Sequence, residues 1–207
     1  MQTSRILLIG NGEAVSARLL KQLARQADYV LAVDGGADNA LASGVMPDGV
    51  IGDLDSVSTR TKKQLTDRML HIPTQENTDL EKALLWTHKH HFTHATLVGF
   101  VGDRWDFCMG NVLFLASYAR KIDLTLAGDG WRMDFLTRGA TFSTKLKKRV
   151  SLIPLTRCTG VTLTGLQYPL AGATLPVGTT RSLSNETADN EFGVQLSRGI
   201  LLVYREV

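Results

Sequence analysis

The segment from Tyr29 to Ser58 constrains the fold more than any other, because two short apolar runs in it each end in acidic residues. Tyr29–Val33 is followed by Asp34-Gly35-Gly36, and Val50–Ile51 is followed by Gly52-Asp53-Leu54-Asp55-Ser56. Short β-branched runs between helical patterns are typical of parallel strands buried on both faces. Ligands of open α/β sheets bind beyond the carboxyl ends of such strands. The segment therefore predicts an α/β sheet with a ligand site at its carboxyl edge.

The pair Asp53 and Asp55 indicates what this site would bind. In an extended segment, residues i and i+2 point the same way, so both carboxylates would face one site. Two neighbouring carboxylates repel unless a cation lies between them, and Mg²⁺ prefers oxygen ligands while keeping positions open for phosphate. The alternative is that Gly-Asp and Asp-Ser pairs are ordinary turn residues. The residues alone leave both interpretations open.

The start of the chain contains an incomplete dinucleotide motif. Arg5–Gly10 is a predicted strand, Gly10-Asn11-Gly12 follows it, and a helical pattern runs from Ala14 to about Ala27. The third glycine of GxGxxG would fall at Val15, so the match fails. The sequence GxxxxGK[ST] does not occur, which excludes a P-loop.

Two later segments carry candidate phosphate or metal chemistry. Thr78 and Glu81 have the spacing of a capping box, which predicts a helix start with Asp79 in its first turn. Asp79 would either complement the helix dipole, worth about 0.3–1 kcal/mol, or bind metal. Arg104 follows a predicted strand and would either clamp phosphate oxygens or form a surface ion pair with Asp106.

The segment from His88 to His94 holds four histidines, but their spacing fits no zinc motif. Polar and cationic groups at a helix C-terminus are favourable on their own, which is the simpler interpretation.

Helical periodicity disappears after Gly139, and short strands recur between Gly and Pro residues, which predicts a sandwich or barrel. We place a domain boundary there, giving domains 1–138 and 139–207. The strand Met133–Leu136 is expected to complete the first sheet.

The whole-chain properties narrow the function classes. The 207 residues allow one large or two modest domains, and the net charge of +3 comes without a dense basic block that would indicate nucleic acid. No apolar run approaches transmembrane length, and the first ten residues fit a strand better than a signal peptide. Cys108 and Cys158 are far apart and outside any CxxC, which favours free thiols. We expect a cytoplasmic protein that binds neither nucleic acid nor membrane.

Four motifs in order resemble the thiamine pyrophosphokinase family, almost from end to end. They read Asp34-Gly35-Gly36 with Pro47-Asp48 and Gly52-Asp53-Leu54-Asp55-Ser56; Gln75-Glu76-Asn77-Thr78-Asp79; Gly102-Asp103-Arg104-Trp105-Asp106-Phe107 with Asn111; and Gly165-Leu166-Gln167-Tyr168-Pro169-Leu170 with Ser184-Asn185-Glu186. Two positions depart from the family pattern: Asp103 replaces a usual Gly, and Phe107 replaces the His common in bacterial members.

The resemblance implies a Rossmann-like α/β domain over 1–138, with a mostly parallel sheet flanked by helices, that binds ATP and Mg²⁺. It implies an antiparallel β-sandwich over 139–207 that binds thiamine and dimerises. The family transfers the pyrophosphoryl group of ATP to the hydroxyl of thiamine, giving thiamine diphosphate and AMP. Its members are homodimers with the thiamine pocket at the subunit interface.

The resemblance also implies residue roles. The expected metal ligands are Asp53, Asp55 and Asp79. The expected ATP-binding residues are Asp34, Gly35, Gly36, Gln75, Thr78 and Arg104. The expected catalytic residues are Asp79, Arg104 and Asp106, and the expected thiamine-binding residues are Asp106, Trp131, Ser184 and Asn185. Trp131 is equally well explained as a core or interface aromatic at a strand end.

Two rival functions stay open at this point. A non-catalytic sensor of thiamine diphosphate or nucleotide would keep the pockets but lose metal carboxylates, and all three expected ones are present. A pyrophosphokinase for another hydroxylated heterocycle would have the same metal motifs and a different pocket.

Overall fold

The computed structural model describes residues 4–74 and 76–207, which form two compact units, one ending at Asp129 and the other running from Gly130 to Val207. The division precedes the boundary expected at Gly139, because strand β7 (Trp131–Leu136) pairs antiparallel with β14 (Leu201–Glu206) along its whole length. Met133–Leu136 therefore belongs to the second compact unit.

The first unit contains a parallel sheet with the strand order β6-β5-β1-β2-β3-β4. Its strands are β1 (Arg5–Ile9), β2 (Tyr29–Val33), β3 (Gly49–Gly52), β4 (Met69–His71), β5 (His94–Val98) and β6 (Asp123–Gly128). In β1, β2 and β3 every residue after the first is buried, as expected for central strands covered on both faces. The predicted α/β sheet is confirmed.

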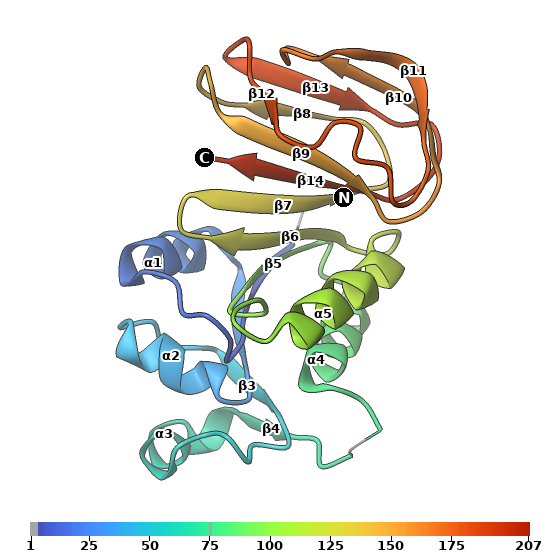
Figure 1. Cartoon of the computed structure of the whole chain (residues 1–207). Helices are drawn as coiled ribbons and strands as arrows, with labels where there is room; N and C mark the ends of the chain where they lie inside the picture. The colour runs from blue at the N-terminus through green and yellow to red at the C-terminus, as the bar shows by residue number, and fades with distance from the viewer. Residues whose placement is uncertain (1–3, 75) are drawn as a thin grey trace. The chain divides into compact units, whose positions relative to one another are not determined.

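Helices cover both faces of this sheet. They are α1 (Ala17–Gln26), α2 (Gly36–Ala42), α3 (Thr59–Gln64), α4 (Asp79–Lys89) and α5 (Trp105–Tyr118), with a 3₁₀ turn over Thr66–Arg68. Figure 1 shows α1, α2 and α3 on one face and α4 and α5 on the other. Among the described residues, no helix has the length and hydropathy needed to cross a lipid bilayer.

Side-chain caps fix where two of these helices begin. The Ser16 hydroxyl accepts a hydrogen bond from Leu19 N and donates to Asp129 Oδ1 at 2.6 Å. This cap starts α1 at Ala17, three residues later than the periodicity predicts. Thr78 Oγ1 accepts from Glu81 N at 3.3 Å, which confirms the predicted start of α4.

The second unit is a sandwich of two antiparallel layers of four strands each, ordered β12-β9-β14-β7 and β11-β10-β13-β8. The remaining strands are β8 (Ala140–Ser143), β9 (Arg149–Pro154), β10 (Cys158–Thr164), β11 (Leu170–Leu175), β12 (Asn185–Glu186) and β13 (Glu191–Gln195). Its core takes side chains from both sheets, including Leu152 of β9 and Phe192 of β13. The predicted sandwich is confirmed, and Cys108 and Cys158 are free thiols as expected.

Two adjacent leucines of α4 provide a matched test of the packing. Leu84 is fully buried, whereas Leu85 is 46% exposed. Leu84→Ala should lower the free energy of unfolding by about 2–5 kcal/mol, because it opens a cavity in the core. Leu85→Ala should cost less than about 1 kcal/mol. Urea denaturation of both variants checks this, and equal losses would contradict the packing of α4.

Candidate functional site

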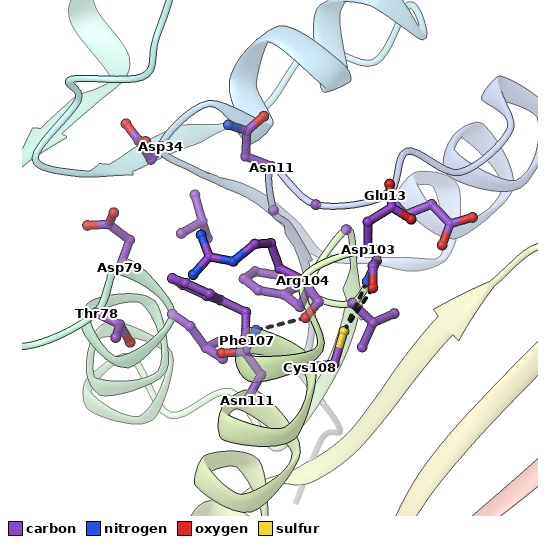
Figure 2. A pocket seen from close by; sticks show the side chains of 18 of the residues that line it. Asn11, Glu13, Asp34, Thr78, Asp79, Asp103, Arg104, Phe107, Cys108 and Asn111 are labelled. Atoms are coloured by element: carbon purple, nitrogen blue, oxygen red, sulfur yellow. Dashed lines mark hydrogen bonds between the residues drawn. The ribbon is translucent and has the colours of Figure 1, made fainter.

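A pocket of about 680 Å³ opens at the carboxyl edge of the parallel sheet (Figure 2). The strand order reverses at β1, because β2, β3 and β4 lie on one side of it and β5 lies on the other. The chain leads from β1 to β2 on one side and from β5 to β6 on the other, and open α/β sheets bind ligands at such a switch point. The lining residues include Gly10, Asn11, Gly12 and Glu13 after β1, Asp34 after β2, Thr78 and Asp79 at the start of α4, and Gly99 to Arg104 after β5, with Phe107, Cys108 and Asn111 of α5.

Close backbone contacts explain the glycines of the β1 loop. Gly12 N donates to Gly99 O at 2.7 Å, and a β-carbon on Gly10 would lie 2.5 Å from that same oxygen. Side chains at these positions would separate the two loops that form the pocket wall. In the sequence, Gly10-Asn11-Gly12 is only an incomplete dinucleotide motif. Its position directly after a strand was the signal that it lines a site.

Three carboxylates converge beside the pocket. Asp34, Asp53 and Asp55 each offer an oxygen, and these atoms lie within 4.8 Å of one another. Asp34 is 7% exposed, and its Oδ1 is buried without a hydrogen-bond partner. A buried carboxylate oxygen in this state is costly unless a cation or donor meets it, so the arrangement fits an oxygen-coordinated metal ion.

The loop after β3 brings Asp53 and Asp55 together by a turn. The expectation of an extended segment is wrong, because β3 ends at Gly52 and Leu54 has a positive φ of 65°. Asp53 Oδ1 instead accepts a hydrogen bond from Asp55 N at 3.2 Å, the local pattern of an Asx turn.

Asp38 of α2 anchors the far end of this loop. Its carboxylate accepts from Ser58 N at 2.9 Å, from Ser58 Oγ at 2.5 Å and from Thr61 Oγ1 at 2.6 Å. Nothing in the sequence pattern singled out Asp38, because its partners lie 20 and 23 residues away.

Asp79 and Asp34 both approach Gly52 closely. A β-carbon on Gly52, whose φ is +149°, would lie 3.1 Å from Asp34 Cβ and 3.2 Å from Asp79 Oδ1. Asp79 Oδ1 also forms an ion pair with Lys82 Nζ at 2.8 Å. Asp79 is thus adjacent to the carboxylate group, with one oxygen already bound to a lysine that the sequence analysis missed.

Arg104 lies at the pocket with its guanidinium held from two sides. Its Nε and Nη2 donate to the two oxygens of Asp106, at 2.9 and 2.5 Å. Its Cζ lies 4.4 Å from the centre of the Phe107 ring, which is a cation–π contact. Hydrogen bonds from Arg104 hold the pKa of Asp106 down to about 2. Both alternatives considered for Arg104 are compatible with this, because the ion pair exists and the residue also lines the pocket.

Side chains of α5 brace the loop that carries Arg104 (Figure 2). Asn111 Nδ2 donates to Phe100 O at 2.7 Å, and Gly102 N donates to Cys108 Sγ at 3.2 Å. This gives the asparagine downstream of the arginine motif a structural function. Asp103 is exposed and lies beside Glu13 in Figure 2, away from Asp34 and Asp79.

The other expected ATP-binding residues take varied positions. Thr78 lines the pocket, but Gly35 and Gly36 are not among the described residues that do so. A β-carbon on Gly36 would lie 2.0 Å from Ile9 O, so this glycine allows α2 to begin against β1. Gln75 lies outside the described residues.

The expected thiamine residues of the second unit differ in exposure. Ser184 is exposed, and its N donates to Ser151 Oγ at 2.9 Å. Asn185 is buried, accepts from Tyr168 N at 3.1 Å and donates to Tyr168 O at 2.8 Å. Asn185 therefore joins the two parts of the fourth sequence motif. Trp131 is half-buried and stacks on Tyr204 with ring centres 6.5 Å apart.

The histidines of 88–94 do not form a metal site among the described residues. Two of these histidines contact different residues. The His90 ring stacks on the Trp86 ring with centres 3.8 Å apart, and His94 Nε2 lies 3.2 Å from Asp123 Oδ2. The described His, Cys, Asp and Glu residues that converge closely enough to share an ion are Asp34, Asp53 and Asp55.

Two family models match the chain in the order that the fold presents. Residues 20–126 match the thiamin pyrophosphokinase catalytic domain, and residues 140–201 match the thiamin pyrophosphokinase vitamin B1 binding domain. The chain belongs to the thiamin pyrophosphokinase family. The first match covers the parallel sheet and the pocket, and the second covers most of the sandwich.

Similar proteins extend over nearly the whole chain. Thiamine pyrophosphokinase of Bacillus subtilis is 27% identical over 183 residues, which cover 84% of this chain and 86% of that protein. A crystal structure of thiamin pyrophosphokinase from Geobacillus thermodenitrificans is 26% identical, with a TM-score of 0.83 over 98% of this chain and 97% of that one. Thiamin pyrophosphokinase from Candida albicans, at 16% identity, shares the fold with a TM-score of 0.84 over 99% of this chain and 90% of that one.

The contact between Arg104 and Asp106 has a measurable consequence. The Asp106 carboxyl, with its pKa near 2, should stay ionised as the pH falls through the range where an ordinary aspartate, near 3.9, takes up a proton. Arg104→Ala should return the pKa toward that ordinary value. Carboxyl ¹³C NMR titration of Asp106 measures both values. An Asp106 pKa near 3.9 in the unmodified protein would contradict the bidentate pair.

Proposed function

We propose that this protein transfers the pyrophosphoryl group of ATP to the hydroxyl of thiamine, giving thiamine diphosphate and AMP. The observation that carries the proposal is the convergence of Asp34, Asp53 and Asp55 beside the pocket at the switch point of the sheet. Family membership supports this activity over the rival functions. A sensor has no need for three converging carboxylates, one of them with a buried oxygen that has no hydrogen-bond partner.

The donor set fits Mg²⁺. Ligands on opposite sides of a Mg²⁺ ion lie about 4 Å apart, given bonds of about 2.0–2.1 Å, and the three carboxylate oxygens fall within a comparable span. We propose Asp53 and Asp55 as ligands together with Asp34, and retain Asp79 as a further carboxylate whose Oδ1 is bound to Lys82. A bound Mg²⁺ ion would neutralise phosphate charge during the transfer.

Arg104 is the proposed contact for the phosphates. Asp106 and Phe107 both contact its guanidinium, and these contacts favour one orientation of the side chain at the pocket. Phosphoryl-type transfer depends on such positioning and on charge stabilisation. Thr78, at the pocket wall, would contact phosphate or ribose.

Asp106 is better suited to holding Arg104 than to accepting a proton. A general base works best with a pKa near the working pH, and a carboxylate with a pKa near 2 is far from it. We therefore propose Asp106 as a residue that orients Arg104 and thiamine. Asp79 remains a candidate for the proton acceptor.

The proposed contacts with thiamine rest on family membership. We propose that Ser184 and Trp131 contact thiamine and that the active form is a homodimer with its active site at the subunit interface. Ser184 is exposed on the sandwich, and Trp131 presents a partly exposed ring, which suits an aromatic cation. The buried Asn185 would act indirectly, by holding Tyr168 beside this surface.

The reaction is tested by incubating the protein with ATP, Mg²⁺ and thiamine and separating the products by chromatography. AMP and thiamine diphosphate should form in equal amounts and disappear with EDTA. ADP with thiamine monophosphate would overturn the proposed point of attack on ATP. Tight binding of thiamine diphosphate without turnover would favour the sensor.

A matched pair of variants controls this experiment. Asp53→Asn should lower turnover by about 100-fold or more, because even groups that only support metal ligands cost about 10- to 100-fold when lost. Asp67→Asn, at an exposed aspartate in the 3₁₀ turn, should leave turnover unchanged. Near-normal turnover of Asp53→Asn would refute the metal assignment.

Variants at two neighbouring residues of the sandwich distinguish an effect on thiamine binding from an effect on folding. Ser184→Ala should raise the KM for thiamine several-fold with an unchanged melting temperature, since its side chain is exposed. Asn185→Ala should lower the free energy of unfolding by about 1–3 kcal/mol, because it leaves the backbone groups of Tyr168 unpaired. Steady-state kinetics and thermal unfolding measure the two effects. An unchanged KM in Ser184→Ala would remove Ser184 from the proposed pocket.

A further inference from the structure

Lys82 is a buried lysine that no motif explains. It lies in α4, its side chain is 3% exposed, and its Nζ contacts Asp79 Oδ1 at 2.8 Å. Lysine is rarely buried unless it is paired, because removing an ammonium group from water is costly. A lysine placed here only for packing could be replaced by a leucine or methionine of similar size. The positive charge of Lys82 therefore calls for an explanation other than packing.

The surroundings of Asp79 supply that explanation. Asp79 Oδ1 lies 3.2 Å from where a β-carbon of Gly52 would be, and Asp34 Cβ lies 3.1 Å from the same point. Asp34 in turn shares the convergent group with Asp53 and Asp55. Helix α4 packs against β2 and β3, the strands that end at these residues. The ammonium group of Lys82 thus contacts a carboxylate that lies next to the three convergent ones.

The Lys82 ammonium group places a positive charge beside these carboxylates. Like charges at these separations repel, and each added negative charge strengthens the attraction for a divalent cation. A site that held Mg²⁺ very tightly by itself would gain little from the phosphates of an incoming nucleotide.

We propose that Lys82 is a positioning residue that sets the affinity of this site for divalent cations. Its ammonium group holds Asp79 by Oδ1 and offsets negative charge at the site, so that the free protein binds the ion weakly and the nucleotide phosphates complete its coordination. This inference deepens the proposed function and rests on the metal site in it.

The direct test is Mn²⁺ binding in the absence of nucleotide, followed by electron paramagnetic resonance. Lys82→Met keeps the length of the side chain and removes the charge, so Mn²⁺ should bind about tenfold more tightly than to the unmodified protein. Lys89→Met is the matched control, because Lys89 is an exposed lysine in the last turn of the same helix. It should leave the affinity unchanged. Unchanged or weaker Mn²⁺ binding by Lys82→Met would overturn the proposal.

A second comparison guards against misfolding. Lys82→Met leaves Asp79 without its partner, so the pair is also tested in an Asp79→Asn background. The double variant Asp79→Asn/Lys82→Met has no buried charge left unpaired in this contact. It should bind Mn²⁺ about tenfold more tightly than Asp79→Asn alone, which retains the lysine charge. Equal affinities would contradict the role of the lysine.

Kinetics distinguish this role from direct phosphate binding. If Lys82 contacts the nucleotide, Lys82→Met will raise the KM for ATP while leaving Mn²⁺ affinity unchanged, which refutes our assignment. With the role proposed here, the Mg²⁺ concentration that gives half-maximal turnover should fall. Failure of the proposed function itself would appear separately, as absence of product from the unmodified protein, because the Mn²⁺ titration needs no turnover.

Discussion

The repulsion among carboxylates at the ends of β2 and β3 is the constraint on which the site depends. Asp34, Asp53 and Asp55 converge within 4.8 Å, and Asp34 is buried with one oxygen unpartnered. Such an arrangement is unfavourable for an apoprotein and persists only if the surrounding structure determines it. The positive φ of Asp34, at 47°, is a further local cost at the same residue.

The scaffold that holds these groups is the buried parallel sheet. The central strands β1, β2 and β3 bury nearly all their residues, so their carboxyl ends have fixed positions. Contacts at the strand ends then position the loops. Asp38 accepts hydrogen bonds from Ser58 and Thr61. Gly52 leaves room for Asp34 and Asp79 to approach, and Thr78 caps α4. The hydrophobic core therefore stabilises a site whose own charges oppose its assembly.

Charge at the pocket is organised into two regions. The carboxylates lie on the β2 and β3 side with Lys82 at their edge, and Arg104 lies on the β5 side with Asp106. A nucleotide phosphate chain is attracted to the arginine directly and to the carboxylates only through a cation. This division explains why the site fits a metal–phosphate ligand better than a bare anion, and it fits the catalytic function of the family better than simple storage of a vitamin.

The sequence by itself determined the fold class and the positions of the chemistry. Apolar runs with acidic ends predict parallel strands with a site at their carboxyl edge. The loss of helical periodicity after Gly139 predicts a β-rich second unit. These signals are local in the chain, since strand burial and helix caps depend on neighbouring residues. The four ordered motifs predicted the family because each motif is a short run of neighbouring residues that can be recognised without the structure.

Only the tertiary structure decided which groups meet. The Asx turn at Asp53, the pairing of β7 with β14, the contact of Lys82 with a carboxylate next to the convergent ones and the bracing of Tyr168 by Asn185 are not evident from periodicity. Most of these depend on residues far apart in sequence. Even Asp79 and Lys82, three residues apart, read as an ordinary helical ion pair until the ends of β2 and β3 are placed beside them. Distances between segments are set by the packing of the whole sheet, and no local pattern encodes them.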